Sequence, residues 1–166
     1  MIDMFVHISS GIGVGKTTLS AFDAALKDAG IYNFNLITLS SVIPPKTVIK
    51  FSKFKSKAED WGNKLYVVSA EVRSRQSGMY IGAGLGWYQM KDGRGVFVEH
   101  EAIAETIEAV ESNLEKEIND SLRDLCKFRG IPVVEKKIKI KTCIAKVKDQ
   151  PTSVLVIAAY KSENWI

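Results

Sequence analysis

The chain has no long hydrophobic run and contains only two cysteines and two histidines. Its longest uninterrupted apolar segment, Val154–Tyr160, has seven residues, whereas a membrane-spanning helix needs about 18 or more. No charged-then-apolar leader stands at the N-terminus, so we expect no secretory signal. The two cysteines, Cys126 and Cys143, lie in different contexts and form neither a metal cluster nor a disulfide framework. We therefore expect a cytoplasmic protein without a metal and without a membrane partner.

The composition is that of one ordinary globular domain spanning residues 1–166. Hydrophobic residues make up 46% and charged residues 25% of the 166 residues, which is enough to build a core without disulfides. The net charge of +4, from 23 basic and 19 acidic residues, is too small to indicate a nucleic-acid partner. The basic segment Lys50–Lys64, with its aromatic residues, is too short to change that expectation and is predicted to be a surface loop.

Charge is unevenly distributed along the chain. Residues Glu99–Glu117 are rich in glutamate, and residues Lys136–Lys148 are rich in lysine. Such runs are most often solvated faces. The alternatives are ion pairing within one chain and ion pairing between subunits.

Hydrophobic periodicity predicts two helices and six or seven strands. The first helix is capped by Thr18 and stopped by Gly30, with an apolar stripe that begins at Leu19. The second has the strongest periodic signal, a stripe at positions 103, 107, 110, 114, 118, 122 and 125. The predicted strands are Phe5–Ser10, Phe34–Ser40, Leu65–Val72, Met79–Gln89, Val96–Glu99, Ile138–Ile144 and Val154–Tyr160. This inventory indicates the α+β class, with helices covering sheets.

A glycine-rich segment near the N-terminus partly matches a phosphate-binding loop. Residues Ser10–Thr18 read SGIGVGKTT, but the loop motif requires a glycine at position 10, where the chain has serine. None of the later predicted strands ends in an aspartate that would hold Mg²⁺. We therefore keep nucleotide binding only as a remote alternative, beside a glycine-rich turn with an exposed Lys16.

The most informative segment is Asn33–Pro45, which reads NFNLITLSSVIPP. A predicted strand ends in two adjacent serines and runs within three residues into two prolines. The prolines fix φ at two consecutive positions, supply no amide hydrogen and hold the preceding residue extended. The serine pair is thus predicted to sit at a rigid bend, although serine and proline are also common in ordinary turns.

The wider order of motifs resembles the pyruvoyl-dependent arginine decarboxylases. After Gly15 and Thr17 come LSAFDAAL at 19–26, AGI at 29–31, NFNL at 33–36 and SSVIPP at 40–45. VEHE at 98–101 and AAYK at 158–161 follow far downstream. The resemblance spans essentially the whole chain, is densest over residues 11–45, and is weak in Lys50–Lys64.

The resemblance implies a self-processing enzyme. The chain is expected to break between Ser40 and Ser41, giving fragments 1–40 and 41–166, and Ser41 is expected to become a covalent pyruvoyl group. That group forms a Schiff base with arginine and takes up the electrons released with CO₂, leaving agmatine. Neither pyridoxal phosphate nor a metal is needed. The family fold is a layered α/β/β/α sandwich of one domain with mostly antiparallel strands.

The resemblance also assigns roles to individual residues. Glu99 is expected to return a proton to the α-carbon, which requires a raised pKa and hence partial burial. From the residues alone, a glutamate in the first turn of the long helix is the alternative interpretation. Asn35 is expected to assist cleavage beside Ser40 and Ser41. Asp23 is expected to bind the guanidinium group, and the positions near the substrate are Leu26, Tyr32 and Phe34, for which a plain core role is the alternative.

Two further expectations concern the neighbour of Glu99 and the assembly. His100 follows Glu99 in a strand, so its side chain points to the opposite face and is expected to lie outside the site. Relatives place each active site between subunits of a homotrimer, some of which pair into hexamers. Trp61, Trp87 and Trp165 are candidate interface anchors.

Three alternatives to arginine decarboxylation remain open at this point. The chain could decarboxylate another amino acid by the same chemistry. It could stay uncleaved and act as a non-catalytic paralogue. The phosphate-loop nucleotide binder is the remote third possibility.

Overall fold

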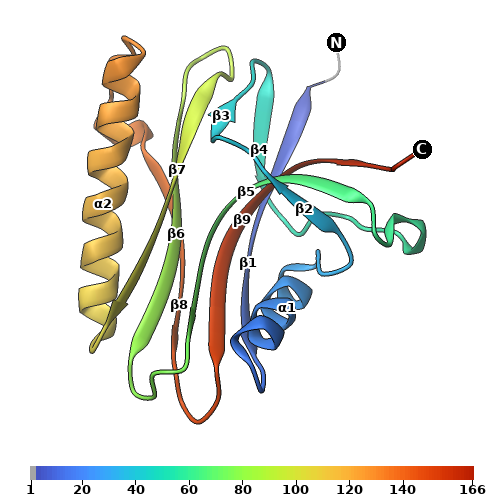
Figure 1. Ribbon diagram of the computed structural model, residues 1–166. Helices are drawn as coiled ribbons and strands as arrows, with labels where there is room; N and C mark the ends of the chain where they lie inside the picture. The colour runs from blue at the N-terminus through green and yellow to red at the C-terminus, as the bar shows by residue number, and fades with distance from the viewer. Residues whose placement is uncertain (1–2) are drawn as a thin grey trace.

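The computed structural model describes residues 3–166, over which two α-helices and nine strands are arranged in four layers (Figure 1). The helices are α1, Thr18–Ala29, and α2, Ile107–Phe128. The strands are β1 Met4–Val14, β2 Asn35–Thr38, β3 Val42–Ile43, β4 Thr47–Phe51, β5 Lys64–Ser74, β6 Tyr80–Gln89, β7 Gly95–Ala104, β8 Lys139–Lys146 and β9 Thr152–Glu163. Two short 3₁₀ helices are η1, Ala58–Asp60, and η2, Glu135–Lys137.

Two sheets lie face to face, and each carries one helix on its outer face. The five-stranded sheet has the order β2-β5-β9-β1-β4, and the four-stranded sheet has the order β3-β7-β6-β8. Among the strand pairs of residues 3–166, β1–β4 and β2–β5 are parallel and the others are antiparallel. The predicted α+β sandwich with layers α/β/β/α is confirmed. The predicted strand count was too low, because the short strands β3 and β4 flank the two prolines and carry little periodic signal.

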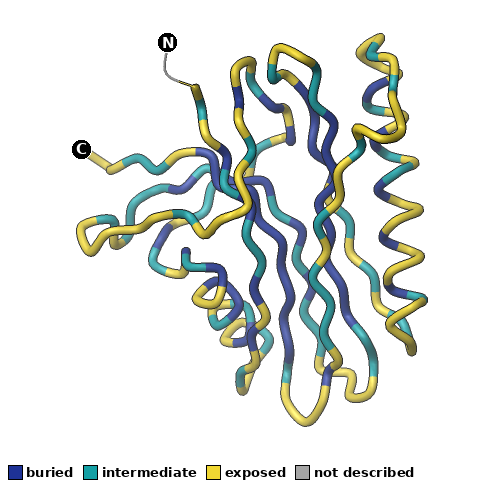
Figure 2. The backbone as a smooth tube through the Cα atoms, turned by 180° about the vertical axis from the view of Figure 1, so that it is seen from behind, coloured by how far each residue is buried: buried dark blue, intermediate teal, exposed yellow. Residues whose placement is uncertain are grey.

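The core between the sheets is built from the inward faces of the central strands. It includes Val156 and Ala158 of β9, which is buried from Thr152 to Tyr160, as predicted for a strand with apolar residues on both faces. Phe97 of β7 is fully buried in the same cluster. Figure 2 shows the buried backbone concentrated in these strands and the exposed backbone in the loops and on the outer sides of the helices.

Helix α1 packs directly on the backbone of β1. A Cβ atom at Gly13 would lie 2.2 Å from the carbonyl oxygen of Ala21, so only glycine allows this approach. The helix is capped by Thr17, whose hydroxyl accepts from the Ser20 amide, and not by Thr18. It ends at Gly30 with a φ of +87°, as predicted. Leu19 lies outside the buried stripe and is 67% exposed, because the small alanines of α1 form the contact instead.

Helix α2 covers the four-stranded sheet in the same way. Its buried stripe consists of Val110, Leu114, Ile118, Leu122 and Cys126. A Cβ atom at Gly86 of β6 would lie 2.2 Å from Cγ2 of Ile118, so here too glycine lets the helix approach the sheet. The predicted start at residue 103 is wrong, because β7 continues to Ala104 and the helix begins at Ile107.

The glycine-rich segment that partly matched a phosphate loop is mostly strand. Residues 11–14 belong to β1 and pair with residues 152–155 of β9, so their amides do not form a loop around an anion. Lys16 is exposed. The expectation of a turn over the whole segment is wrong, because the glycines serve the contact with α1.

The segment Lys50–Lys64 is largely exposed but anchored by its aromatic residues. Phe54 packs edge-to-face on Phe34 with ring centroids 5.8 Å apart, and Phe51 packs on Trp87 at 5.7 Å.

Within residues 3–166, no ion pair joins the glutamate-rich and lysine-rich runs, so intrachain pairing between them is not found. No helix of the described chain is long and apolar enough to cross a membrane.

Candidate active site

The Ser40–Ser41 bond lies where the chain passes from one sheet to the other. Strand β2 is an edge of the five-stranded sheet, and β3 is an edge of the four-stranded sheet. The Leu39 amide donates to the Val67 carbonyl at 2.8 Å, and the Phe97 amide donates to the Ser41 carbonyl at 2.8 Å. Both sides of the bond are therefore fixed to different sheets.

Ser41 has a strained backbone. Its φ is +72°, in the left-handed region that residues with a Cβ rarely adopt. Such a conformation costs on the order of 1–3 kcal/mol and persists only where neighbouring structure enforces it. The hydrogen bond from Phe97 and the following prolines supply that enforcement. The predicted rigid bend is confirmed at this residue.

The side chain of Ser41 points at Glu99 of β7. Its hydroxyl lies 2.9 Å from Oε2 and 3.1 Å from Oε1 of the carboxylate, and Ser41 is only 6% exposed. The hydroxyl donates to a group that is able to take its proton. Because β3 pairs only with Gly95 and Val96, the edge of β7 is free of a strand partner from Phe97 onward, and this leaves room for the contact.

A pocket of about 270 Å³ opens at this contact. Both serines and Glu99 line it, together with Phe97, Val98, His100, Ser121 and Leu125. His100 lies on the face of β7 opposite Glu99, as predicted, and its Nε2 atom is 2.8 Å from the Ser121 hydroxyl of α2. The expectation that His100 lies outside the site is nevertheless wrong, because the free edge of β7 exposes both faces of the strand to one pocket.

Tyr160 is a site residue to which sequence reasoning gave no role. Its hydroxyl donates to the Val42 carbonyl at 3.1 Å, one residue beyond Ser41, and its ring packs edge-to-face on Phe97. Burial, and next the negative charge of Glu99, raise the pKa of the phenol above its usual range, so it remains a donor at ordinary pH. The only sequence signal for Tyr160 was its place in the AAYK motif, which contributed to the family resemblance. Its role was not predictable, because the tyrosine contacts Val42, a residue far away in the sequence.

Glu99 is more open to solvent than expected. The sequence predicted a partly buried carboxyl at the end of a strand, but β7 continues to Ala104 and Glu99 is an exposed residue of the single chain. The alternative place in the first turn of α2 is also wrong, because that helix begins at Ile107. Glu99 is thus a residue of β7 whose side chain lies on the same face of the strand as Phe97. At this position no strand of residues 3–166 pairs with the outer edge of β7.

The residues expected to bind substrate gather around α1. Asp23 is exposed on the helix, while Leu26 and Phe34 are buried in the cluster between α1 and the five-stranded sheet, with exposures of 7% and 8%. Tyr32 is 42% exposed, and the ammonium of Lys27 lies 5.9 Å from its ring centroid. Leu26 and Phe34 therefore have the core contacts that were their alternative interpretation.

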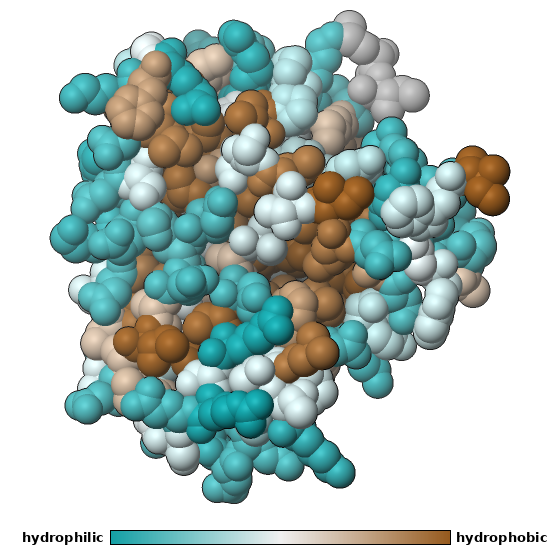
Figure 3. All heavy atoms as spheres, viewed as in Figure 1, coloured by the Kyte–Doolittle hydropathy of each residue, from teal (hydrophilic) through white to brown (hydrophobic). Residues whose placement is uncertain are grey.

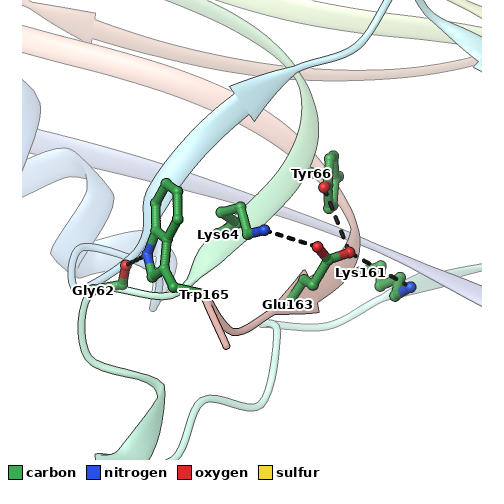
Figure 4. Close-up of polar contacts among 6 residues, drawn as sticks. All are labelled: Gly62, Lys64, Tyr66, Lys161, Glu163 and Trp165. Carbon is green, nitrogen blue, oxygen red and sulfur yellow. Dashed lines mark hydrogen bonds and ion pairs between the residues drawn. The ribbon is translucent and has the colours of Figure 1, made fainter.

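Asn35 is fixed by the turn before β5 rather than by the serine pair. Its side-chain amide donates to the Gly62 carbonyl at 2.7 Å, which also accepts from the Trp165 indole at 2.8 Å. Figure 4 shows the contact between Trp165 and Gly62 and, beside it, the Glu163 carboxylate accepting hydrogen bonds from Lys64 and Tyr66. The end of β9 and the C-terminal residues thus hold the turn on which the Asn35 amide rests.

The candidate residues form two separate groups. The pocket with Ser41 and Glu99 is walled by α2, whereas Asp23 lies on α1, on the outer face of the other sheet (Figure 1). None of the five residues 23, 26, 32, 34 and 35 lines the pocket. One chain therefore does not bring the two groups together.

Comparison with known proteins agrees with this arrangement of motifs. The family model described as pyruvoyl-dependent arginine decarboxylase matches residues 5–164. The chain is 32% identical over 155 residues to a Halobacterium salinarum protein named pyruvoyl-dependent arginine decarboxylase, covering 93% of this chain and 92% of that protein. A protein of the same name from Thermococcus kodakarensis is 32% identical over 152 residues, covering 90% of each chain. With its strained serine, neighbouring glutamate and full-length match, the chain belongs to the pyruvoyl-dependent arginine decarboxylase family.

Proposed function

We propose that this chain cleaves itself between Ser40 and Ser41 and then converts L-arginine to agmatine and CO₂. The observation that carries the proposal is the buried Ser41 hydroxyl, held within 3.1 Å of both oxygens of Glu99 at a backbone with a φ of +72°. A strained residue bonded to a proton acceptor is prepared for reaction. The family membership supplies the type of reaction.

The cleavage uses groups that are already in place. Glu99 takes the proton of the Ser41 hydroxyl, whose oxygen attacks the Ser40 carbonyl carbon and forms an ester. The carbon–nitrogen bond of the peptide breaks, and the nitrogen of residue 41 takes up the proton from Glu99 and becomes a free amine. Loss of the α-proton of residue 41 then expels the Ser40 carboxylate and leaves a carbon–carbon double bond. After tautomerisation to an imine, one water molecule replaces the nitrogen, ammonia leaves, and a ketone remains. Fragments 1–40 and 41–166 result.

The surroundings of Ser41 fit a pyruvoyl group. The Phe97 amide and the Tyr160 hydroxyl hold the carbonyls of residues 41 and 42, so the new N-terminus of the long fragment stays anchored after cleavage. The pyruvoyl group supplies an electron-withdrawing carbonyl that takes up the electrons released with CO₂. Glu99 is placed within hydrogen-bonding distance of that position and delivers a proton to the α-carbon of the product.

Arginine as the substrate is supported by the names of the relatives and by the chemistry of Asp23. A carboxylate accepts two parallel hydrogen bonds from a planar guanidinium group, which fixes its orientation as well as its position. The Asp23 side chain is exposed on α1 and makes no hydrogen bond or ion pair within residues 3–166. It is therefore available to a ligand.

We propose that the complete site forms between subunits of a homotrimer or of a hexamer. The separation of Asp23 from the pocket at Ser41 supports this, since another chain's α1 would complete the site. Figure 3 shows apolar side chains reaching the surface over the middle of the molecule, and Val42, beside the site, is 51% exposed. Trp61 and Trp165 are exposed enough to act as anchors, whereas Trp87 is only 4% exposed and is not.

Intact mass spectrometry with an activity panel tests the function. We expect two chains in place of the 18.4 kDa polypeptide, with the long fragment carrying a pyruvoyl terminus, and CO₂ release from arginine in preference to lysine, ornithine or histidine. A chain that stays whole after long incubation is instead a non-catalytic paralogue. Cleaved protein that releases CO₂ from a different amino acid keeps the chemistry and changes the substrate.

Mixing two inactive variants tests the shared site. Asp23→Ala and Glu99→Gln proteins, dissociated and reassembled together, recover part of the activity if the two residues act from different chains. Light scattering on the wild-type protein provides the complementary measurement. A fully active monomer would rule out the shared site.

We further propose that the protein works in the reducing cytoplasm. Cys126 and Cys143 are both free thiols in the structure. Burial raises the pKa of each thiol above its ordinary value, which keeps them protonated and unreactive. Neither cysteine forms a disulfide that an oxidising compartment would have to maintain.

A further inference from the structure

A second pocket, remote from the serine pair, opens where the edges of the two sheets face each other. It has a volume of about 410 Å³, within the general size range of small-ligand sites. One wall comes from β4 and the other from β6, η2 and β8. Its lining residues are Ile49, Phe51, Trp87, Gln89, Met90, Lys91, Lys136, Lys137 and Lys139, none of which belongs to the site described above.

The floor of this pocket is apolar. Trp87 is 4% exposed and belongs to the core between the sheets, whereas Phe51 is 66% exposed although it packs on Trp87. Met90 continues the apolar surface beside them. An exposed phenylalanine ring over a pocket offers a stacking surface to a planar ligand.

The rim of the pocket carries four lysines and no acidic residue. None of the four forms an ion pair within residues 3–166. The two carboxylates adjacent to these lysines in sequence, Asp92 and Glu135, are held by Arg94 and Arg123. The net charge of the whole chain is +4, so these lysines equal its entire positive excess. Like charges gathered at one mouth repel each other, and an anion bound there relieves that repulsion.

We propose that this pocket, the lysine pocket, binds an anion with a flat aromatic body and at least two negative charges, the chemistry of a nucleoside di- or triphosphate. The ring covers Phe51 and Met90, and the phosphates reach the ammonium groups of η2 and β8. Lysine binds phosphate as a point charge and needs no fixed geometry, which suits side chains on a short 3₁₀ helix. This site is distinct from the glycine-rich segment at residues 11–15, most of which is strand.

A competing occupant is the glutamate-rich run 99–117 of a second copy of the chain. That occupant would make the pocket a subunit interface. Removing lysines would then lower the mass of the assembly, whereas a small-ligand site leaves the mass unchanged. The test therefore measures both ligand affinity and assembly size.

The test is calorimetric titration of the purified protein with ATP, adenosine and inorganic tripolyphosphate. We expect ATP to bind at least about tenfold more tightly than either fragment, since each fragment lacks one of the two kinds of contact. We also expect ATP to shift the indole resonance of Trp87. Tripolyphosphate binding as tightly as ATP would overturn the proposal, as would an ATP dissociation constant above about 10 mM.

A matched pair of double variants locates the binding. Lys136→Gln with Lys137→Gln is expected to weaken ATP binding by at least about tenfold, because two charged contacts are lost. Lys55→Gln with Lys57→Gln removes the same charge from an exposed segment outside the pocket and is expected to leave the affinity unchanged. Equal losses in the two double variants would indicate only diffuse attraction. A reduced assembly mass in the first variant would indicate an interface between copies. Either result overturns the proposal.

Discussion

The two halves of the candidate site differ in how completely one chain builds them. At Ser41 the hydroxyl, the acceptor Glu99 and the hydrogen bonds that hold the backbone are all present in a single chain. At Asp23 there is only an exposed carboxylate on a helix, with buried apolar neighbours. Self-cleavage is an intramolecular reaction, so one chain has to contain its machinery. Arginine binding has no such requirement, and the surface around Asp23 is free to contact another subunit.

The same contrast appears in the backbone. The serine pair lies in a crossing between sheets, with a positive φ at Ser41 and hydrogen bonds to both sheets. Asp23 lies in the middle of α1, a regular helix with a capping box at Thr17. Of the two halves, only the one with the proposed cleavage bond contains a non-glycine residue in the left-handed region, and breaking that bond would separate no strand from its sheet partner.

Replacing the nucleophile gives the largest expected effect and affects only the cleavage half directly. Ser41→Ala removes the attacking hydroxyl, so the chain stays whole and releases no CO₂, as measured by intact mass and an activity assay. Ser40→Ala is the matched control, because Ser40 contributes only its carbonyl carbon and the chain should still split. Cleavage of the Ser41→Ala protein at this bond would remove the mechanism.

Replacing the acceptor separates chemistry from folding in the same half. Glu99→Gln keeps a group that accepts from Ser41 but is unable to take or deliver a proton. Turnover per cleaved chain should fall about 10²–10⁴-fold, and cleavage should slow. Glu101→Gln, two residues along β7 and absent from the pocket lining, is the control and should leave kcat unchanged. Similar losses in both variants would indicate a general effect of charge.

The substrate half should respond in KM rather than kcat. Asp23→Asn removes a charged partner of the guanidinium group, so the KM for arginine should rise about tenfold or more while kcat changes little. Asp28→Asn on the same helix is the control, since an amide oxygen still accepts from the Ile12 amide. Steady-state kinetics on cleaved protein decide the matter. Unchanged arginine kinetics in Asp23→Asn would show that the guanidinium assignment is wrong.

The smallest effect is expected for Tyr160, which supports the backbone next to the cleavage bond without taking part in the reaction. Tyr160→Phe removes the hydroxyl that donates to the Val42 carbonyl while keeping the ring on Phe97. One lost hydrogen bond corresponds to roughly a three- to tenfold slower cleavage, followed by timed electrophoresis. Tyr66→Phe, which loses only a 3.5 Å contact to Glu163, should cleave at the wild-type rate. Equal rates for all three proteins would show that Tyr160 only fills the core.

Much of the fold was predictable because it depends on local pattern. The apolar run of β9 and the middle of the α2 stripe, from Val110 to Leu122, were identified from spacing alone and are buried as expected. The ends of the predicted stripe are not: Ile103 and Ile107 are exposed. The boundaries failed where a strand continues without a change in composition, as at Glu99 within β7. Strand β3 is two residues long and has no periodicity, because it exists only through its pairing with β7.

The sequence by itself determined which chemistry the chain contains: two serines before two prolines, a glutamate in VEHE and an aspartate on an amphipathic helix. These are properties of residue type and local spacing, and local rules are sufficient to identify them. Only the tertiary structure decided which of these groups meet. Ser41 and Glu99 are 58 positions apart in the chain, and they touch because β3 begins only at Val42 and leaves the edge of β7 beyond Val96 without a strand partner. Asp23 and Ser41 are much closer in sequence, yet they are kept apart because α1 and α2 cover opposite faces of the paired sheets.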